Sequence, residues 1–210
     1  WIKPDLDANS DRGDVLLMID NEDRLRSFYG EIKSKKQEAQ WVVTHREVKN
    51  FKEFVDEFEA ATTSKQYDNI IVDCLTDLID AYIVEIRENG FSGDIRQHYL
   101  AIYTKVKFLV RKAAFCATNI IFNCWEDVEM VTLPSGEMVN RVSPMLPSKI
   151  KQQVCGLCNV VAYVTSANDK QGKRQWYFIT EGNPTMMAKD QLFLRKNCMP
   201  EGLFTDPNAK

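Results

Sequence analysis

Short apolar runs alternate with amphipathic stretches along most of the chain. The runs predict strands buried on both faces at residues 15–19, 41–44, 69–73 and 119–123. Between them, apolar positions recur with helical spacing at about 51–58, 75–86 and 97–114. Asn50, with Glu53 three residues later, predicts the N-cap of the first of these helices. Such alternation predicts an α/β fold, in which a mostly parallel sheet has helices on both faces.

The pattern changes after residue 125. Residues 130–133 and 138–139 flank a Pro-Ser-Gly-Glu segment and predict a hairpin. Residues 160–165 and 176–179, separated by a polar stretch, predict a second hairpin. Antiparallel strands of this kind are common at the edge of a parallel sheet. Without repeats or an interdomain linker, we expect a single core over residues 1–201 and a polar tail over 202–210.

Three of the predicted strands end in polar residues, which are Asp20-Asn21-Glu22-Asp23, Asp73-Cys74 and Asn123-Cys124-Trp125-Glu126. Ligands of open α/β sheets bind outside the carboxyl ends of the strands, so we expect these side chains to converge on one crevice. Several acids in one crevice suit a hydrated Mg²⁺, which prefers one or two carboxylates together with substrate phosphates. Any one of these acids could instead serve as a turn or N-cap residue.

The composition is that of an ordinary globular protein. The chain has 210 residues, of which 44% are hydrophobic and 27% charged, which excludes fibrous and wholly disordered classes. With 27 Lys and Arg against 30 Asp and Glu, the formal net charge is -3, so a nucleic-acid contact would need a local basic patch. No apolar run approaches the roughly 18 to 20 residues that span a bilayer. We therefore expect no membrane association.

Six cysteines lie scattered through apolar surroundings, in a chain too large to need disulfide staples. This favours a reducing, cytoplasmic compartment. Cys155 and Cys158 have the CxxC spacing of redox and zinc sites. A zinc site needs four ligands, and the two histidines, His45 and His98, are remote in sequence. We therefore interpret the pair as buried structural cysteines.

Two further features could contact single-stranded DNA. Arg141 and Lys149 bracket a segment without regular periodicity, although most basic residues simply form a solvated face. Trp41, Trp125 and Trp176 could stack on bases. Because Trp41 and Trp176 fall within predicted strands, we expect those two in the core.

Several segments together resemble a known family. Residues 67–78 look like the Walker B strand and following helix of RecA-like P-loop ATPases. Residues 142–149, 156–163 and 187–190 are similar to stretches of phage nucleotide-binding proteins of the AAA/RecA type. The resemblance covers about 15–192 and includes proteins built from a RecA core that act in single-strand annealing. It implies an ATP- and Mg²⁺-dependent phage recombination protein that works as a homo-oligomer on single-stranded DNA in the host cytoplasm, with a single-strand binding protein as a further partner.

The resemblance also assigns roles to individual residues. Asp73 corresponds to the Walker B acid, which holds Mg²⁺ through water, and Glu22 to the glutamate that activates the attacking water. Asn123 corresponds to the polar sensor of the γ-phosphate, although Cys124 follows it where the family has glutamine. Lys173 and Arg174 correspond to basic residues that reach the γ-phosphate of a neighbouring subunit.

One element of the family pattern is missing from these residues. A Gly-x-x-x-x-Gly-Lys-Ser/Thr loop, whose backbone N–H groups and lysine hold the phosphates, does not occur. The family places this loop before the segment that is here Trp1, so we expect it upstream and expect weak ATP binding without it. The alternative is a non-catalytic DNA-annealing or scaffold module that keeps the fold and does not turn over nucleotide. A GK[ST] loop encoded immediately upstream of Trp1 would favour the enzyme.

Overall fold

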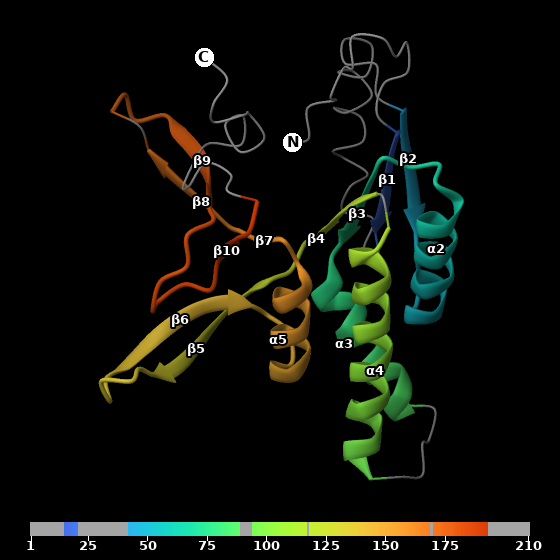
Figure 1. Ribbon diagram of the computed structural model, residues 1–210, viewed down its shortest axis with the longest axis horizontal. Coiled ribbons are helices and arrows are strands. Elements are labelled where there is room, and N and C mark those ends of the chain that lie inside the picture. The colour runs from blue at the N-terminus through green and yellow to red at the C-terminus, as the bar shows by residue number, and fades with distance from the viewer. Residues whose placement is uncertain (1–14, 21–41, 89–93, 117, 169, 193–210) are drawn as a thin grey trace. The chain divides into compact units, whose positions relative to one another are not determined.

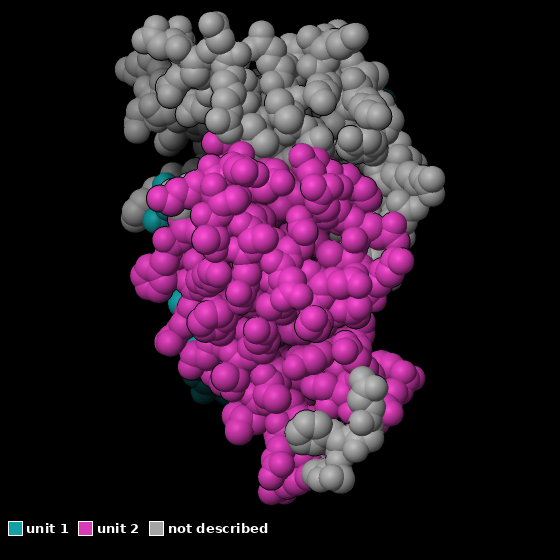
Figure 2. Space-filling view, turned by 90° about the vertical axis from the view of Figure 1, so that its right-hand side faces the viewer, with its two compact units in different colours: residues 1–3, 126–145, 151–210 teal, residues 4–125, 146–150 magenta. Residues whose placement is uncertain are grey.

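The computed structural model describes residues 15–20, 42–88, 94–116, 118–168 and 170–192. These residues form two compact units, which Figure 2 colours separately. Within the described ranges, the unit called the first unit here, which is magenta and labelled unit 2 in Figure 2, holds the residues up to Trp125 together with Leu146–Ile150. The second, which is teal and labelled unit 1 in Figure 2, holds Glu126–Met145 and the residues from Lys151 onward. The expectation of one core through residue 201 stays a prediction.

The first unit is built on a four-stranded parallel sheet in the order β2-β1-β3-β4 (Figure 1). The strands are β1 (Val15–Asp20), β2 (Val42–Glu47), β3 (Asn69–Asp73) and β4 (Asn119–Phe122). All four lie where the apolar runs predict them, and the parallel α/β class is confirmed.

Three helices pack against one another beside this sheet: α2 (Phe51–Ser64), α3 (Leu75–Glu88) and α4 (Ile95–Ala114). The predicted cap is present, because the Asn50 side chain accepts a hydrogen bond from the Glu53 backbone N–H at 2.9 Å. The steps from β2 to β3 and from β3 to β4 run in one direction across the sheet. Right-handed crossovers in one direction place their helices on one face. The expectation of helices on the other face as well stays a prediction, because the connection from β1 to β2 lies outside the described residues.

Alternation along the strands decides which side chains face the helices. Phe122 of β4 meets Phe58 of α2 with ring centroids 6.0 Å apart, and Val72 of β3 is paired in register with Phe122. Phe58 and Val72 are fully buried, so this face is the core. Successive strand residues point to opposite faces, so Asp73 points away from α2.

The second unit consists of antiparallel pairs and the part of one helix from Lys151 onward. β5 (Glu126–Thr132) pairs with β6 (Met138–Pro144), and β8 (Tyr163–Asn168) pairs with β9 (Arg174–Ile179). Both hairpins were predicted, and Gly136 and Gly172 take the positive φ that their turns require. The strand predicted at 160–165, the first of the second hairpin, is divided into two. Its beginning forms β7 (Val160–Val161), which pairs with β10 (Lys189–Asp190), and its end belongs to β8. Helix α5 is Ser148–Leu157.

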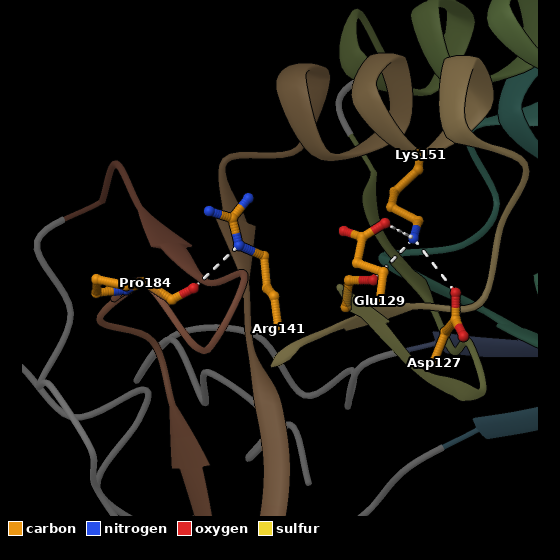
Figure 3. Close-up of polar contacts among 6 residues, drawn as sticks. Asp127, Glu129, Arg141, Lys151 and Pro184 are labelled. Atoms are coloured by element: carbon orange, nitrogen blue, oxygen red, sulfur yellow. Dashed lines mark hydrogen bonds and ion pairs between the residues drawn. The ribbon is translucent and has the colours of Figure 1, made fainter. Parts of the chain in front are cut away.

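A buried lysine joins α5 to the first hairpin (Figure 3). The Lys151 side chain is 4% exposed, and its Nζ donates to Ser143 Oγ at 2.7 Å and to Glu129 Oε2 at 3.0 Å, with Asp127 Oδ2 at 3.5 Å. An ammonium has three N–H groups, and these three acceptors match them. The sequence offered no signal for this cluster beyond alternating acids on β5.

We predict that Lys151→Met lowers the free energy of unfolding by about 2 kcal/mol, because methionine keeps the packing but loses hydrogen bonds to charged groups. Urea denaturation followed by circular dichroism measures the change. Lys149→Met is the matched control, since Lys149 lies exposed on the same helix and should change stability by less than about 0.5 kcal/mol. Equal stabilities for the two variants would contradict a structural role for the cluster.

Candidate nucleotide site at the strand ends

The carboxyl ends of β1, β3 and β4 meet at one edge of the sheet. Asp20 and Asp73 are register partners across β1 and β3. Asn123 directly follows β4, and its Nδ2 donates to Asp73 Oδ1 at 3.3 Å. The predicted convergence of Asp73 and Asn123 is therefore present. Glu22 lies outside the described residues.

The Asn123 backbone is held by the chain around β3 on both sides. Its N–H donates to the carbonyl of Val72 at 3.0 Å, and its carbonyl accepts from the N–H of Leu75 at 2.8 Å. The peptide bond between Asp73 and Cys74 is cis. The two hydrogen bonds of the Asn123 backbone extend the β3–β4 pairing by one residue beyond the sheet, and they fix the Asn123 side chain beside the Asp73 carboxylate.

A second polar layer lies next to this pair and was missed by the sequence analysis. The Trp125 indole N–H donates to Asp77 at 2.9 and 3.1 Å to its two oxygens, and the Trp125 backbone N–H donates to Thr76 Oγ1. The Cys74 thiol also donates to Asp77, at 2.8 Å. Burial, followed by that hydrogen bond, raises the pKa of Cys74 to about 12. Cys74 is therefore a neutral donor at pH 7 that helps to orient Asp77.

The arrangement fits a magnesium ion held partly by phosphate. Mg²⁺ keeps several waters and takes one or two protein carboxylates beside substrate phosphates. Asp73 supplies one carboxylate at the open edge of the sheet, with an amide beside it. No group of three or more acidic, histidine or cysteine side chains within the described ranges could form an all-protein metal cage. The donor set thus suits Mg²⁺ that arrives with a nucleotide.

A sequence model of the AAA domain family matches residues 10–192. The chain belongs to the AAA domain family. This match covers β1, β3 and β4 together with both hairpins. It agrees with the resemblance to P-loop ATPases, because AAA domains are nucleotide-binding ATPase domains that generally use ATP with Mg²⁺. No curated protein matches the chain. No helix in the described part of this AAA domain is both long and apolar enough to cross a membrane.

The basic candidates of this AAA domain lie in different surroundings. Arg141, on β6, is partly buried and its Nε donates to the carbonyl of Pro184 at 3.2 Å (Figure 3). Lys149 is exposed on the first turn of α5. Lys173 and Arg174 are exposed at the β8–β9 turn. Arg141 therefore stabilises a loop as well as offering charge, whereas the side chain of Lys149 is exposed and that of Arg174 contacts its own hairpin through Ser166 and Trp176.

The structure corrects one aromatic expectation. Trp176 lies in β9 as predicted, but it is 50% exposed, so the prediction that it belongs to the core is wrong. Within the described residues, its strand belongs to a two-stranded antiparallel pair with β8, and an antiparallel sheet can leave one face exposed to solvent. Trp41 lies outside the described residues, and Trp125 is 44% exposed.

The CxxC pair is partly buried on and after α5, and no disulfide joins Cys155 to Cys158. Burial raises the pKa of Cys155 to about 11 and also raises the pKa of Cys158. Redox-active cysteines have lowered pKa values, because the thiolate is the nucleophile. The pair therefore lacks the electrostatics of a redox site, in agreement with a structural role.

We predict that Cys155 reacts with iodoacetamide at pH 8 at least about tenfold more slowly than a free thiol of ordinary pKa. Its pKa near 11 leaves it protonated, and the rate should rise as the pH passes that value. Peptide mass spectrometry of timed samples gives the rate, with the urea-unfolded protein as the control. Equal rates in the folded and unfolded protein would contradict the burial of this thiol.

Proposed function

We propose that this AAA domain is the core of a RecA-like ATPase that acts in phage DNA recombination through single-stranded DNA binding or annealing. The observation that carries the ATPase part is the Asp73–Asn123 contact at the carboxyl ends of adjacent parallel strands. Ligands of α/β sheets bind at this edge, and the residues there suit a magnesium-bound triphosphate.

The proposed mechanism is mostly positioning. Mg²⁺, when bound with nucleotide, neutralises phosphate charge. Asp73 would hold it through water, and Asn123 would offer its amide to the γ-phosphate, while the bonds to Val72 and Leu75 keep the Asn123 backbone fixed. Glu22 orients and activates the attacking water. In this proposal a Gly-rich phosphate loop, which does not occur in these 210 residues, would complete the site.

The protein works as a homo-oligomer in this proposal, and a single-strand binding protein is a further partner in the host cytoplasm. Lys173 and Arg174 are proposed to reach the phosphates of a neighbouring subunit. Arg141 and Lys149 are proposed to contact DNA. Lys149 is the better placed for a phosphate, because the Nε of Arg141 already donates to Pro184.

We predict that, in a preparation that hydrolyses ATP, Asp73→Ala and Glu22→Gln each lower kcat for ATP hydrolysis by at least about 100-fold. Glu22→Gln should leave ATP binding intact, since it removes only the base. Asp68→Ala is the matched control, because Asp68 precedes the opposite end of β3 and is exposed. Phosphate release measures hydrolysis, and hydrolysis that survives both site substitutions would exclude these roles.

The second candidate function is a non-catalytic annealing or scaffold module. The departure from the family pattern at Cys124 favours it, because the usual glutamine is absent beside Asn123. Titration of single-stranded DNA against salt, with and without ATP, separates the two. An affinity that ATP does not change, in a protein that hydrolyses none, indicates the module.

A further inference from the structure

We propose that the face of the β8–β9 hairpin that carries Trp176 is a stacking platform for a single-stranded polynucleotide. This inference rests on the single-stranded DNA role proposed above and gives that role a defined surface. The surface, called here the platform face, consists of Val164, Ser166 and Asn168 of β8 together with Arg174, Trp176 and Phe178 of β9.

The strand register places these six residues on one face. Val164 pairs with Phe178, Ser166 with Trp176, and Asn168 with Arg174, and alternate residues of paired strands point the same way. Trp176 and Val164 are each 50% exposed. The platform face therefore presents an indole and a small apolar neighbour to solvent.

Arg174 is already ordered on this face. Its guanidinium lies over the Trp176 ring, 4.8 Å from the centroid, and its Nε donates to Ser166 Oγ at 2.8 Å. Bases of single strands stack on aromatic rings and on guanidinium planes alike. The pair thus places a guanidinium against an indole on the platform face, and the Ser166 hydroxyl of the neighbouring strand holds the guanidinium there before any ligand arrives.

The turn of the hairpin supplies charge for the phosphates. Residues 163–179 contain three cations, Lys170, Lys173 and Arg174, against the single acid Asp169. All three cations are exposed, and Gly172 has the φ of +79° that this turn requires. In a chain of net charge -3, this is the kind of local basic patch that phosphate binding needs.

This combination favours a single strand over a duplex. Bases of a duplex are stacked within the helix, whereas a single strand offers both base faces and phosphates at once. The platform face offers both, with the Arg174–Trp176 pair to contact a base and the cations at the turn to contact the phosphate backbone.

The test is a titration of the purified chain, without nucleotide, against labelled dT and rU oligomers of about 20 nucleotides, followed by fluorescence anisotropy. Trp176→Ala should weaken dT binding about tenfold without changing its salt dependence, and Trp176→Phe should restore most of the affinity. Arg174→Gln should weaken binding and lower the salt slope by about one. If the chain binds dT as tightly as rU or more tightly, the result supports single-stranded DNA as the ligand. If the chain binds rU alone, the proposal that the ligand is DNA is wrong.

Two matched controls keep the result specific. Tyr99→Ala removes an exposed aromatic residue from α4, and Lys52→Gln removes an exposed lysine from α2; both should leave the affinity unchanged. Circular dichroism and melting curves establish that each variant is folded. A folded Trp176→Ala variant with the parent's affinity, or the same loss in Trp176→Phe, overturns the platform.

Failure of the platform and failure of the ATPase proposal are distinguishable. The titrations contain no nucleotide, so an inactive ATPase leaves them unaffected, and the Asp73 and Glu22 tests do not depend on the hairpin. If Arg174→Gln abolishes ATP hydrolysis in a preparation that hydrolyses ATP while dT affinity is unchanged, Arg174 acts on a neighbouring subunit's phosphates and the platform proposal is wrong.

Discussion

The candidate nucleotide site depends on the parallel pairing of β3 with β4 and on its extension past the last strand residue. Register alone brings the two carboxyl ends together, but a strand end is where a chain frays. Here the Asn123 N–H and carbonyl are both bonded, to Val72 and Leu75, and the side chain contacts Asp73. An amide and a carboxylate are thereby held in place at the open edge, as catalysis by charge stabilisation requires.

The parallel sheet and α2 could be predicted from the sequence because apolar runs and helical spacing with an N-cap are both local signals. Continuous apolar runs predict strands buried on two faces, and β1, β3 and β4 lie where those runs lie. The Asn50 cap and the helical spacing after it predicted α2 in the same way. The meeting of Asp73 and Asn123 then followed from topology, because parallel strands place their carboxyl ends at one edge.

The Lys151 cluster, the exposure of Trp176 and the Trp125–Asp77 bond could not be predicted from local sequence patterns. The Lys151 cluster joins residues from two strands and a helix, and its three acceptors become neighbours only after the hairpin and α5 have formed. The exposure of Trp176 depends on how many layers cover its strand, which the alternation of a single segment does not reveal. The Trp125–Asp77 bond links residues 48 positions apart, and no spacing rule connects them.

An exposed tryptophan is by itself an ordinary feature, since much of any protein surface is apolar. The contacts of Arg174 are what separate Trp176 from the other exposed aromatic residues. Ordering a long arginine side chain at the surface costs up to about 2 kcal/mol of conformational entropy, which a single exposed contact does not fully offset. The hairpin meets this cost with two contacts, the indole face and the Ser166 hydroxyl. A ligand that stacks on this pair would find the arginine already ordered, so more of the stacking free energy would appear as affinity.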